Sequence, residues 1–342
     1  MEVLKQKYLV LQTAFLGDAI LTLPFLQLLK KKNPGVLIDV IATPANSEIF
    51  QSSPSVNQVY ILDKKNKHKS LFKSIEFIRE LSGGYSRFYV LHRSFRSAMM
   101  SLFSGISESY GYDTSNMSFV YKHKIKYDSG KHEIRRHFAF LECEITDEEY
   151  NTLPEMSLTA GQTAVVENIL ANNNLVGAAI LAVAPGSVWE TKRYPTKYYL
   201  NIIEYFCNIG VKVVLLGGEN EKLLCGELKI NDSVIDLSGT LSIVESKMII
   251  EKSIMLLTND SASGHIGMAA DARTLMVYCS TVPEFGFYPY NKKSAWISVE
   301  NLECKPCGIH GFKKCPKGHF KCAELLQPME VIQKMEKMLD LR

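Results

Sequence analysis

Gly17 and Asp18 are the first residues whose types and spacing can do chemistry, because they separate an apolar run from a helical pattern. The run Tyr8–Leu11 has the character of a buried parallel strand. A carboxylate just past the carboxyl end of such a strand can accept a proton from a substrate hydroxyl. Gly17 permits a tight turn and a close approach of the backbone. The alternative is that Asp18 caps the helix, which would make it a weaker base.

A second stretch, residues 185–195, also lies between a strand pattern and a helix pattern, and it combines small residues, hydroxyls and two adjacent cations. Ser187, Thr191 and Lys192 make it a candidate cradle for a pyrophosphate, with Lys192 as the charge on the phosphate oxygens. An ordinary surface loop with solvated cations fits the same pattern.

A third stretch, residues 258–265, runs from a strand into a helix through hydroxyl-bearing and small residues. Free amides at a helix start suit an anion, and Asp260, Ser261 and His265 would lie beside it. A capped helix with a satisfied histidine is the alternative. Glu221, and less strongly Glu219, follows a glycine pair at another strand end, where a carboxylate either holds ribose hydroxyls or lies in a surface turn.

Four cysteines crowd the end of the chain with the spacing C-x2-C-x7-C-x6-C. They are Cys304, Cys307, Cys315 and Cys322. Four thiolates with a tight first pair can bind a structural zinc tetrahedrally, although the spacing differs from that of common zinc ribbons. Reduced, packed thiols are the alternative.

The elements that must position these residues alternate between strand and helix along the whole chain, which predicts doubly wound parallel sheets. With 342 residues, 46% of them hydrophobic, the chain suits two domains. We expect one over 1–160 and another over 175–342, the second ending in the cysteine-rich tail 304–322 and a C-terminal helix. Two such halves imply a cleft into which strand carboxyl ends and helix starts face.

Composition narrows the class further. The net charge of +3 does not indicate a nucleic-acid binder. Residues 1–8 lack the apolar core of a secretory signal, and no run approaches the length of a membrane span. We therefore expect a cytoplasmic protein.

Taken in order, the motifs resemble glycosyltransferase family 9, the ADP-heptose:lipopolysaccharide heptosyltransferases. Residues 13–24 resemble the family's opening "GD…TLP" pattern. Pro185-Gly186-Ser187 with residues 192–195 resembles its "PG…KRWP" loop, and Asp260-Ser261 with His265 resembles "D-[ST]-G-x-x-H". His132-Glu133 is a weaker similarity. The sequence departs from the family pattern at Ala262, where glycine is usual, and at Tyr194, where tryptophan is usual; a negative φ would make Ala262 tolerable.

The resemblance implies a GT-B fold of two Rossmann-like domains, with the acceptor bound by the N-terminal half and an ADP-sugar donor by the C-terminal half. It implies an inverting transfer that needs no metal cofactor, with Asp18 as general base and Lys192 on the diphosphate. Gly17, Ser187, Thr191, Glu221, Asp260, Ser261 and His265 would serve the donor.

The expected acceptor is a lipid-linked core saccharide, so transient contact with the inner face of the cytoplasmic membrane is expected as well. Four arginines are candidates for an acidic sugar, through bidentate contacts, or else are solvated surface groups: Arg93, Arg96, Arg135 and Arg136. Three other functions remain open. They are transfer from another nucleotide sugar to a different surface glycan, a non-catalytic nucleotide-sugar-binding protein, and a metal-dependent interaction protein built around the cysteine tail.

Overall fold

The computed structural model describes residues 6–341. Most of the 1–8 stretch, which the sequence analysis compared with a secretory signal, therefore lies outside the described residues. The chain divides into two compact units, Met1–Ser157 and Leu158–Arg342. Residues 161–174, which fall between the two predicted domains, form most of helix α6 (Ala160–Asn172) and group with the second unit, where α6 packs on α9 (Ile243–Glu251).

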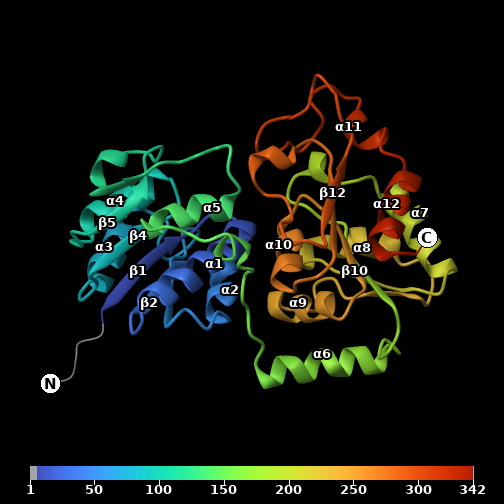
Figure 1. Cartoon of the computed structure of the whole chain (residues 1–342), viewed down its shortest axis with the longest axis horizontal. Helices are drawn as coiled ribbons and strands as arrows, with labels where there is room; N and C mark the ends of the chain where they lie inside the picture. The colour runs from blue at the N-terminus through green and yellow to red at the C-terminus, as the bar shows by residue number, and fades with distance from the viewer. Residues whose placement is uncertain (1–5, 342) are drawn as a thin grey trace. The chain divides into compact units, whose positions relative to one another are not determined.

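The first unit is a six-stranded, wholly parallel sheet with helices on its faces (Figure 1). Its strand order is β3-β2-β1-β4-β5-β6. The strands are β1 (Lys7–Gln12), β2 (Leu37–Ala42), β3 (Gln58–Ile61), β4 (Arg87–Val90), β5 (Ser109–Tyr112) and β6 (His123–Ile125). The helices are α1 (Leu16–Lys32), α2 (Ser47–Gln51), α3 (Leu71–Leu81), α4 (Phe95–Phe103) and α5 (Glu133–Phe138).

The second unit repeats this plan, with a parallel sheet in the order β12-β11-β10-β7-β8-β9. Its strands are β7 (Ile180–Ala184), β8 (Lys212–Leu215), β9 (Val234–Asp236), β10 (Met255–Asn259), β11 (Thr274–Tyr278) and β12 (Ala295–Ser298). Besides α6 and α9, its helices are α7 (Thr196–Asn208), α8 (Lys222–Leu228), α10 (Ala262–Ala269), α11 (Lys321–Glu324) and α12 (Pro328–Leu339).

Local sequence explains most of these elements. The central strands β7, β10 and β11 are buried along their whole length, as parallel strands covered on both faces must be. Helix α3 begins where the Ser70 side chain accepts a hydrogen bond from the Lys73 amide, and α9 begins at a capping box between Ser242 and Glu245. Pro24 lies inside α1, well past its first turn.

Each sheet has one point where the strand order reverses, between β1 and β4 in the first unit and between β7 and β10 in the second. Connections from the two strands beside such a point leave in opposite directions, so a crevice opens at their carboxyl ends. Asp18 follows β1, the 185–195 stretch follows β7, and Asp260 follows β10. The predicted functional stretches therefore sit at the switch points of their own sheets.

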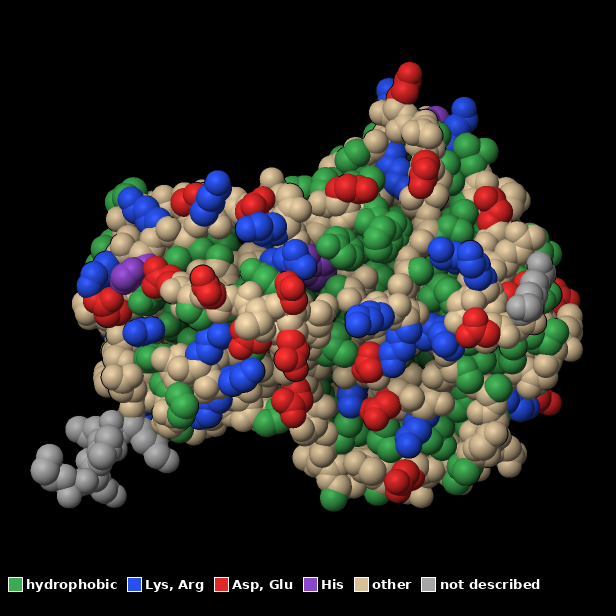
Figure 2. All heavy atoms as spheres, in the orientation of Figure 1, with side chains coloured by type: hydrophobic (Ala, Val, Ile, Leu, Met, Phe, Trp, Pro, Cys, Tyr) green, Lys and Arg blue, Asp and Glu red, His purple; other side chains and the backbone are tan. Residues whose placement is uncertain are grey.

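The surface carries both signs of charge. Figure 2 shows Lys and Arg interspersed with Asp and Glu over the visible face, in keeping with the small net charge. Of the helices that the structure describes, none combines the length and the apolar character that a membrane crossing requires.

Candidate functional site

Asp18 lies in the first turn of α1, two residues inside a helix that begins at Leu16. Its Oδ2 accepts a hydrogen bond from the Phe15 amide at 3.2 Å, so the helix-capping interpretation is correct in part. Burial nevertheless raises the pKa of Asp18 to about 6, with a further rise from Glu133 and opposing effects from His137 and the Phe15 amide. A carboxylate with that pKa is a better base than an ordinary aspartate. Gly17 precedes it in the same turn.

A buried charged cluster on α5 packs against α1 and acts on Asp18. His137 is 1% exposed, with Nδ1 3.2 Å from the Leu21 carbonyl oxygen and Nε2 3.4 Å from Glu133 Oε1. Both ring nitrogens thus face oxygen acceptors, which fixes the orientation of the ring between α1 and Glu133. Burial alone would raise the pKa of Glu133, but His137 and Arg136 outweigh it and lower that pKa to about 2.

The four predicted acceptor arginines differ in how far they are engaged by the protein itself. Arg136 is 2% exposed and donates to Glu133 Oε2 (2.6 Å), to the Tyr127 hydroxyl and to two backbone carbonyls. Arg96 donates to the His68 and Lys69 carbonyls. These two arginines therefore hold the fold together.

Arg93 and Arg135 are exposed instead, and each guanidinium lies over a tyrosine ring. The Arg93 guanidinium carbon is 3.9 Å from the centre of the Tyr127 ring, and that of Arg135 is 4.7 Å from the Tyr150 ring. Stacking on a ring orients a guanidinium while leaving its edge for a ligand. These two arginines are the better placed for an anionic sugar.

Three polar groups that the sequence analysis missed meet beside the β1 end. Thr13 Oγ1 lies 2.9 Å from His92 Nδ1, and Lys64 Nζ donates to the Thr13 carbonyl at 2.8 Å. Burial lowers the pKa of His92 to about 4, with Lys64 and Arg93 adding to the effect, so the ring is neutral near pH 7. Only the pairing of β1 with β4 brings residues 13 and 92 together, so no local pattern marked them.

In the second unit the two predicted phosphate-binding stretches meet directly. Lys192 Nζ lies 2.6 Å from Asp260 Oδ2, with both side chains largely buried, and the Thr281 hydroxyl donates to the same oxygen at 2.7 Å. A lysine ammonium retains further donors after one carboxylate contact. The pair therefore holds a cation in a fixed position at the switch point, with donors left for an anion.

Glu221 lies against the Gly186 backbone, at the ends of β7 and β8. Its Oε2 accepts from the Gly218 amide at 2.7 Å, and a Cβ added at Gly186 would come within 1.8 Å of its Oε1. Only glycine at 186 leaves that space. Glu219 instead forms an exposed ion pair with Lys222 at 2.8 Å. The geometry thus favours Glu221 over Glu219 as a carboxylate that shapes the site.

Two side chains hold the 185–195 stretch in place. Asn259 is fully buried, donates to the Pro185 carbonyl at 2.6 Å and accepts from the Tyr194 amide at 2.9 Å. The Thr191 hydroxyl accepts from the Phe312 amide at 2.8 Å and from the Ser280 hydroxyl at 3.0 Å. Because hydrogen-bonded loops of this kind need little rearrangement, the stretch is held in shape before any ligand arrives.

Ser187, Ser261 and His265 lie around the same strand ends. Ser187 is 6% exposed and accepts from the Trp189 amide at 3.4 Å. Ser261 precedes α10 without a side-chain cap and lies 3.2 Å from the Thr258 hydroxyl, while His265 is 4% exposed inside the helix. Ala262 begins α10 and is not among the described residues with positive φ, so alanine fits there.

The cysteine tail contributes to this region through its backbone and His310 rather than through its thiols. The Thr191 amide donates to the Phe312 carbonyl at 3.0 Å, and the His310 ring stacks on Trp189 with 6.3 Å between ring centres. Burial and then Lys192 lower the pKa of His310. Within residues 6–341, no group of three or more His, Cys, Asp or Glu side chains is arranged to hold a metal ion. The zinc at Cys304, Cys307, Cys315 and Cys322 therefore stays a prediction.

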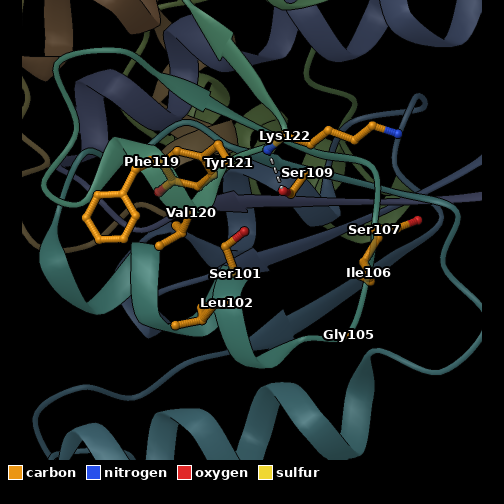
Figure 3. A pocket seen from close by; sticks show the side chains of 10 residues that line it. All are labelled: Ser101, Leu102, Gly105, Ile106, Ser107, Ser109, Phe119, Val120, Tyr121 and Lys122. Atoms are coloured by element: carbon orange, nitrogen blue, oxygen red, sulfur yellow. Dashed lines mark hydrogen bonds between the residues drawn. The ribbon is translucent and has the colours of Figure 1, made fainter.

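A separate cavity of about 280 Å³ opens in the first unit, away from Asp18 (Figure 3). It is lined by the end of α4, by residues 105–107 and Ser109, and by Phe119–Lys122. Ser109 begins β5 and Lys122 precedes β6, so the cavity lies at the amino ends of these strands. Ligands of such folds bind at the carboxyl ends, so we do not place the candidate site in this cavity.

Comparisons with known proteins identify a matching family and similar sequences. The model of a family described as glycosyltransferase family 9 (heptosyltransferase) matches residues 74–314. Lipopolysaccharide heptosyltransferase 1 of Pseudomonas aeruginosa is 24% identical over 88% of this chain and 86% of its own length. Lipopolysaccharide heptosyltransferase 2 of Salmonella typhimurium is 21% identical over 97% of this chain and 98% of its own length.

Solved structures share the fold across the whole chain. A glycosyltransferase of family 9 from Veillonella parvula aligns with a TM-score of 0.88 and 20% identity, over 100% of this chain and 99% of that one. An E. coli heptosyltransferase solved with ADP aligns with a TM-score of 0.74 and 17% identity, over 97% of this chain and 100% of that one. The predicted GT-B fold of two Rossmann-like domains is thereby confirmed.

Proposed function

The chain belongs to glycosyltransferase family 9, the heptosyltransferase family, and from that premise we propose that it moves heptose from ADP-heptose to the inner core of lipopolysaccharide. It is a glycosyltransferase, and its relatives act as lipopolysaccharide heptosyltransferases. We propose, beyond this, which sugar is transferred, that the transfer inverts the anomeric configuration, and which role each residue has.

One observation carries the proposal: the 2.6 Å contact between Lys192 and Asp260 at the switch point of the second sheet. As the glycosidic bond breaks, the departing ADP gains negative charge. A cation already fixed in place stabilises that charge most in the transition state and so raises the rate of the chemical step. Asp260 is the positioning group for Lys192 and also faces the sugar diphosphate.

Asp18 is the proposed general base. The acceptor hydroxyl oxygen forms a bond to the anomeric carbon while the bond from that carbon to the ADP oxygen breaks, which inverts the configuration. The hydroxyl proton passes to the Asp18 carboxylate, and ADP leaves with the electron pair. The raised pKa of Asp18, about 6, suits proton transfer near neutral pH.

The remaining donor contacts follow from the strand ends described above. Ser187 and the amides at the start of α10, next to Ser261, would bind phosphate oxygens, and His265 would lie near the sugar. Glu221 would face the nucleoside. Thr191 supports this site by anchoring the tail at Phe312, and Gly17 keeps backbone access beside Asp18.

The acceptor in this proposal is a lipid-linked saccharide bearing acidic groups, met by Arg93 and Arg135. Its lipid would bring the protein to the inner face of the cytoplasmic membrane. No metal ion takes part in the proposed step, because Lys192 and helix amides supply the positive charge. Elemental analysis of the purified protein, with and without chelator, tests whether the cysteine tail holds zinc.

The experiment that tests the function is incubation with ADP-heptose and a lipid-linked core acceptor, read as ADP release and as a mass increase of one heptose. Asp18→Ala should remove both signals. A panel of other nucleotide sugars identifies the donor, and faster turnover of another member would replace heptose in the proposal. ADP-heptose binding without turnover on any acceptor would favour a binding protein instead.

A further inference from the structure

The connection from β3 to α3 and the first residues of α3 form a basic loop, defined here as residues 64–73. Five lysines fall within these ten residues, with no acidic residue among them: Lys64, Lys65, Lys67, Lys69 and Lys73. The whole chain has a net charge of only +3, so this loop carries more positive charge than the protein has in sum. Lys73 forms an ion pair with Glu76 at 2.9 Å. The other four lysines repel one another, and an anionic partner would relieve that repulsion.

The loop is held in one shape by internal hydrogen bonds. Asp63 Oδ1 accepts from the Lys65 and Asn66 amides, both at 3.1 Å, and the Asp63 amide donates to His68 Nδ1 at 3.0 Å. His68 is 5% exposed and its ring lies 4.7 Å from that of Phe77. Arg96, from the first turn of α4, donates to the His68 carbonyl at 2.6 Å and to the Lys69 carbonyl at 2.7 Å. The lysines therefore project from a built surface.

What the loop presents outward is cationic and aromatic. Lys65, Lys67 and Lys69 are exposed, and Phe72, in the first turn of α3, is 70% exposed. Phe95 begins α4 beside the loop-binding Arg96 and is 48% exposed. Cations around protruding aromatic side chains are the features by which peripheral proteins bind an anionic bilayer, since the rings enter the headgroup layer while the lysines meet lipid phosphates.

The position of the loop fits that partner. Lys64 Nζ donates to the Thr13 carbonyl, so the loop starts at the same carboxyl edge of the first sheet as Asp18. We propose that the basic loop, with Phe72 and Phe95, docks the first unit on an anionic lipid bilayer and thereby brings Asp18 to lipid-linked acceptors. Binding to the bilayer does not depend on the proposed function. Only its purpose, which is to bring Asp18 to lipid-linked acceptors, rests on that function.

Co-sedimentation with vesicles tests the docking without any transfer reaction. Wild-type protein should bind vesicles of phosphatidylglycerol and phosphatidylethanolamine, and raising the salt should weaken that binding, because the Debye length shrinks. The triple variant Lys65→Gln, Lys67→Gln, Lys69→Gln should bind about 100-fold more weakly, given the usual contribution of each lysine at an anionic surface. Phe72→Ser should weaken binding about tenfold, including the part that persists at high salt.

Matched controls separate the loop from general charge. Lys229, Lys252 and Lys292 are exposed lysines of the second unit, and their triple change to Gln removes the same charge. Leu223→Ser removes an apolar side chain that is 86% exposed. Neither control should alter vesicle binding, and an equal loss in the lysine control would overturn the proposal.

A second assay separates membrane docking from acceptor recognition. With a deacylated, soluble acceptor, the loop triple variant should keep the wild-type KM and kcat, while transfer to acceptor embedded in vesicles falls. A raised KM for the deacylated acceptor would assign the loop to the saccharide and overturn the docking proposal. Vesicle binding by a protein that transfers no sugar would instead defeat the proposed function and leave the docking result standing.

Discussion

The carboxyl edges of the two sheets have the same topology but differ in how their polar side chains are engaged. In the second unit they bind one another: Lys192 with Asp260, and Asn259 with Pro185 and Tyr194. In the first unit the buried charges lie behind Asp18, on α5, while Arg93 stands exposed over a tyrosine ring.

The difference suggests how a two-domain transferase divides its work. On the proposed function, the second edge would bind the nucleotide diphosphate, and its mutually hydrogen-bonded side chains would need little reorganisation during the reaction. The exposed arginines of the first edge would meet the acceptor saccharide. We infer that changes at the second edge disturb folding and donor binding together, whereas changes at the first edge separate catalysis, pH dependence and acceptor affinity.

The largest expected effect is at Asp18. Asp18→Asn keeps the shape of the side chain but removes the base, so kcat should fall by about 10²–10⁴-fold. The dissociation constant for ADP-heptose should stay as in the wild type, measured by calorimetry. Wild-type turnover in this variant would show that Asp18 is not the base. The proposed division between catalysis at the first edge and donor binding at the second would then be wrong.

The next largest effect is expected at Lys192, which in the proposed mechanism meets the leaving ADP. Lys192→Ala should lower kcat by about 10²–10³-fold, because the charge on departing ADP loses its fixed cation, and it should weaken ADP binding as well. Lys197→Ala, a nearby lysine in an exposed ion pair with Glu324, is the matched control and should behave as wild type. Equal kinetics in the two variants would rule out Lys192 as the phosphate cation.

Asn259→Ala tests whether the second edge is held in shape by its own hydrogen bonds, because the change should lower the free energy of unfolding. Its loss leaves the Pro185 carbonyl, the Tyr194 amide and the Tyr199 hydroxyl without a buried partner. The free energy of unfolding should fall by about 3 kcal/mol, with a lower Tm in calorimetry and weaker ADP binding. At the first edge, Thr13→Val removes one partly buried contact with His92 and should cost about 1 kcal/mol. Equal losses would contradict the contrast.

The pH dependence of kcat/KM should sharpen the role of the cluster behind Asp18. Asp18 must be unprotonated to act as a base, so activity should fall as the pH drops through about 6. Glu133 raises the pKa of Asp18 and His137 lowers it. Glu133→Gln should therefore move the acid limb to lower pH, and His137→Gln should move it to higher pH, each by about half a unit. Shifts in the same direction would show that α5 acts only through folding.

The smallest expected effect is on acceptor affinity. Arg93→Ala should raise the KM for the acceptor about fivefold, the size of a partly screened ionic contact, with Tm unchanged. Arg96→Ala should instead lower the Tm, because its guanidinium ties down the His68 and Lys69 carbonyls. A lower Tm for the Arg93 variant, or an unchanged KM, would place Arg93 with the structural arginines.

Elements with strong local patterns could be predicted from the sequence. The predicted strand over Tyr8–Leu11, the strands expected at the start of the 185–195 and 258–265 stretches and the C-terminal helix are all present, as β1, β7, β10 and α12. The short edge strands β6 and β9 were not predicted, and neither was β5, whose residues are Ser-Tyr-Gly-Tyr. Such strands owe their conformation to pairing with a neighbour, so the local pattern carries little of it.

The sequence alone determined the general alternation of strands and helices and the placing of Asp18, Lys192 and Asp260 in stretches that follow strands, because hydrophobic periodicity and turn residues act over a few neighbouring positions. Tertiary structure alone decided that Lys192 pairs with Asp260, that Glu133 and His137 lie against α1, and that Arg136 is buried while Arg93 is not. These outcomes depend on which strands become neighbours, and that follows from burying the whole core at once rather than from any local stretch.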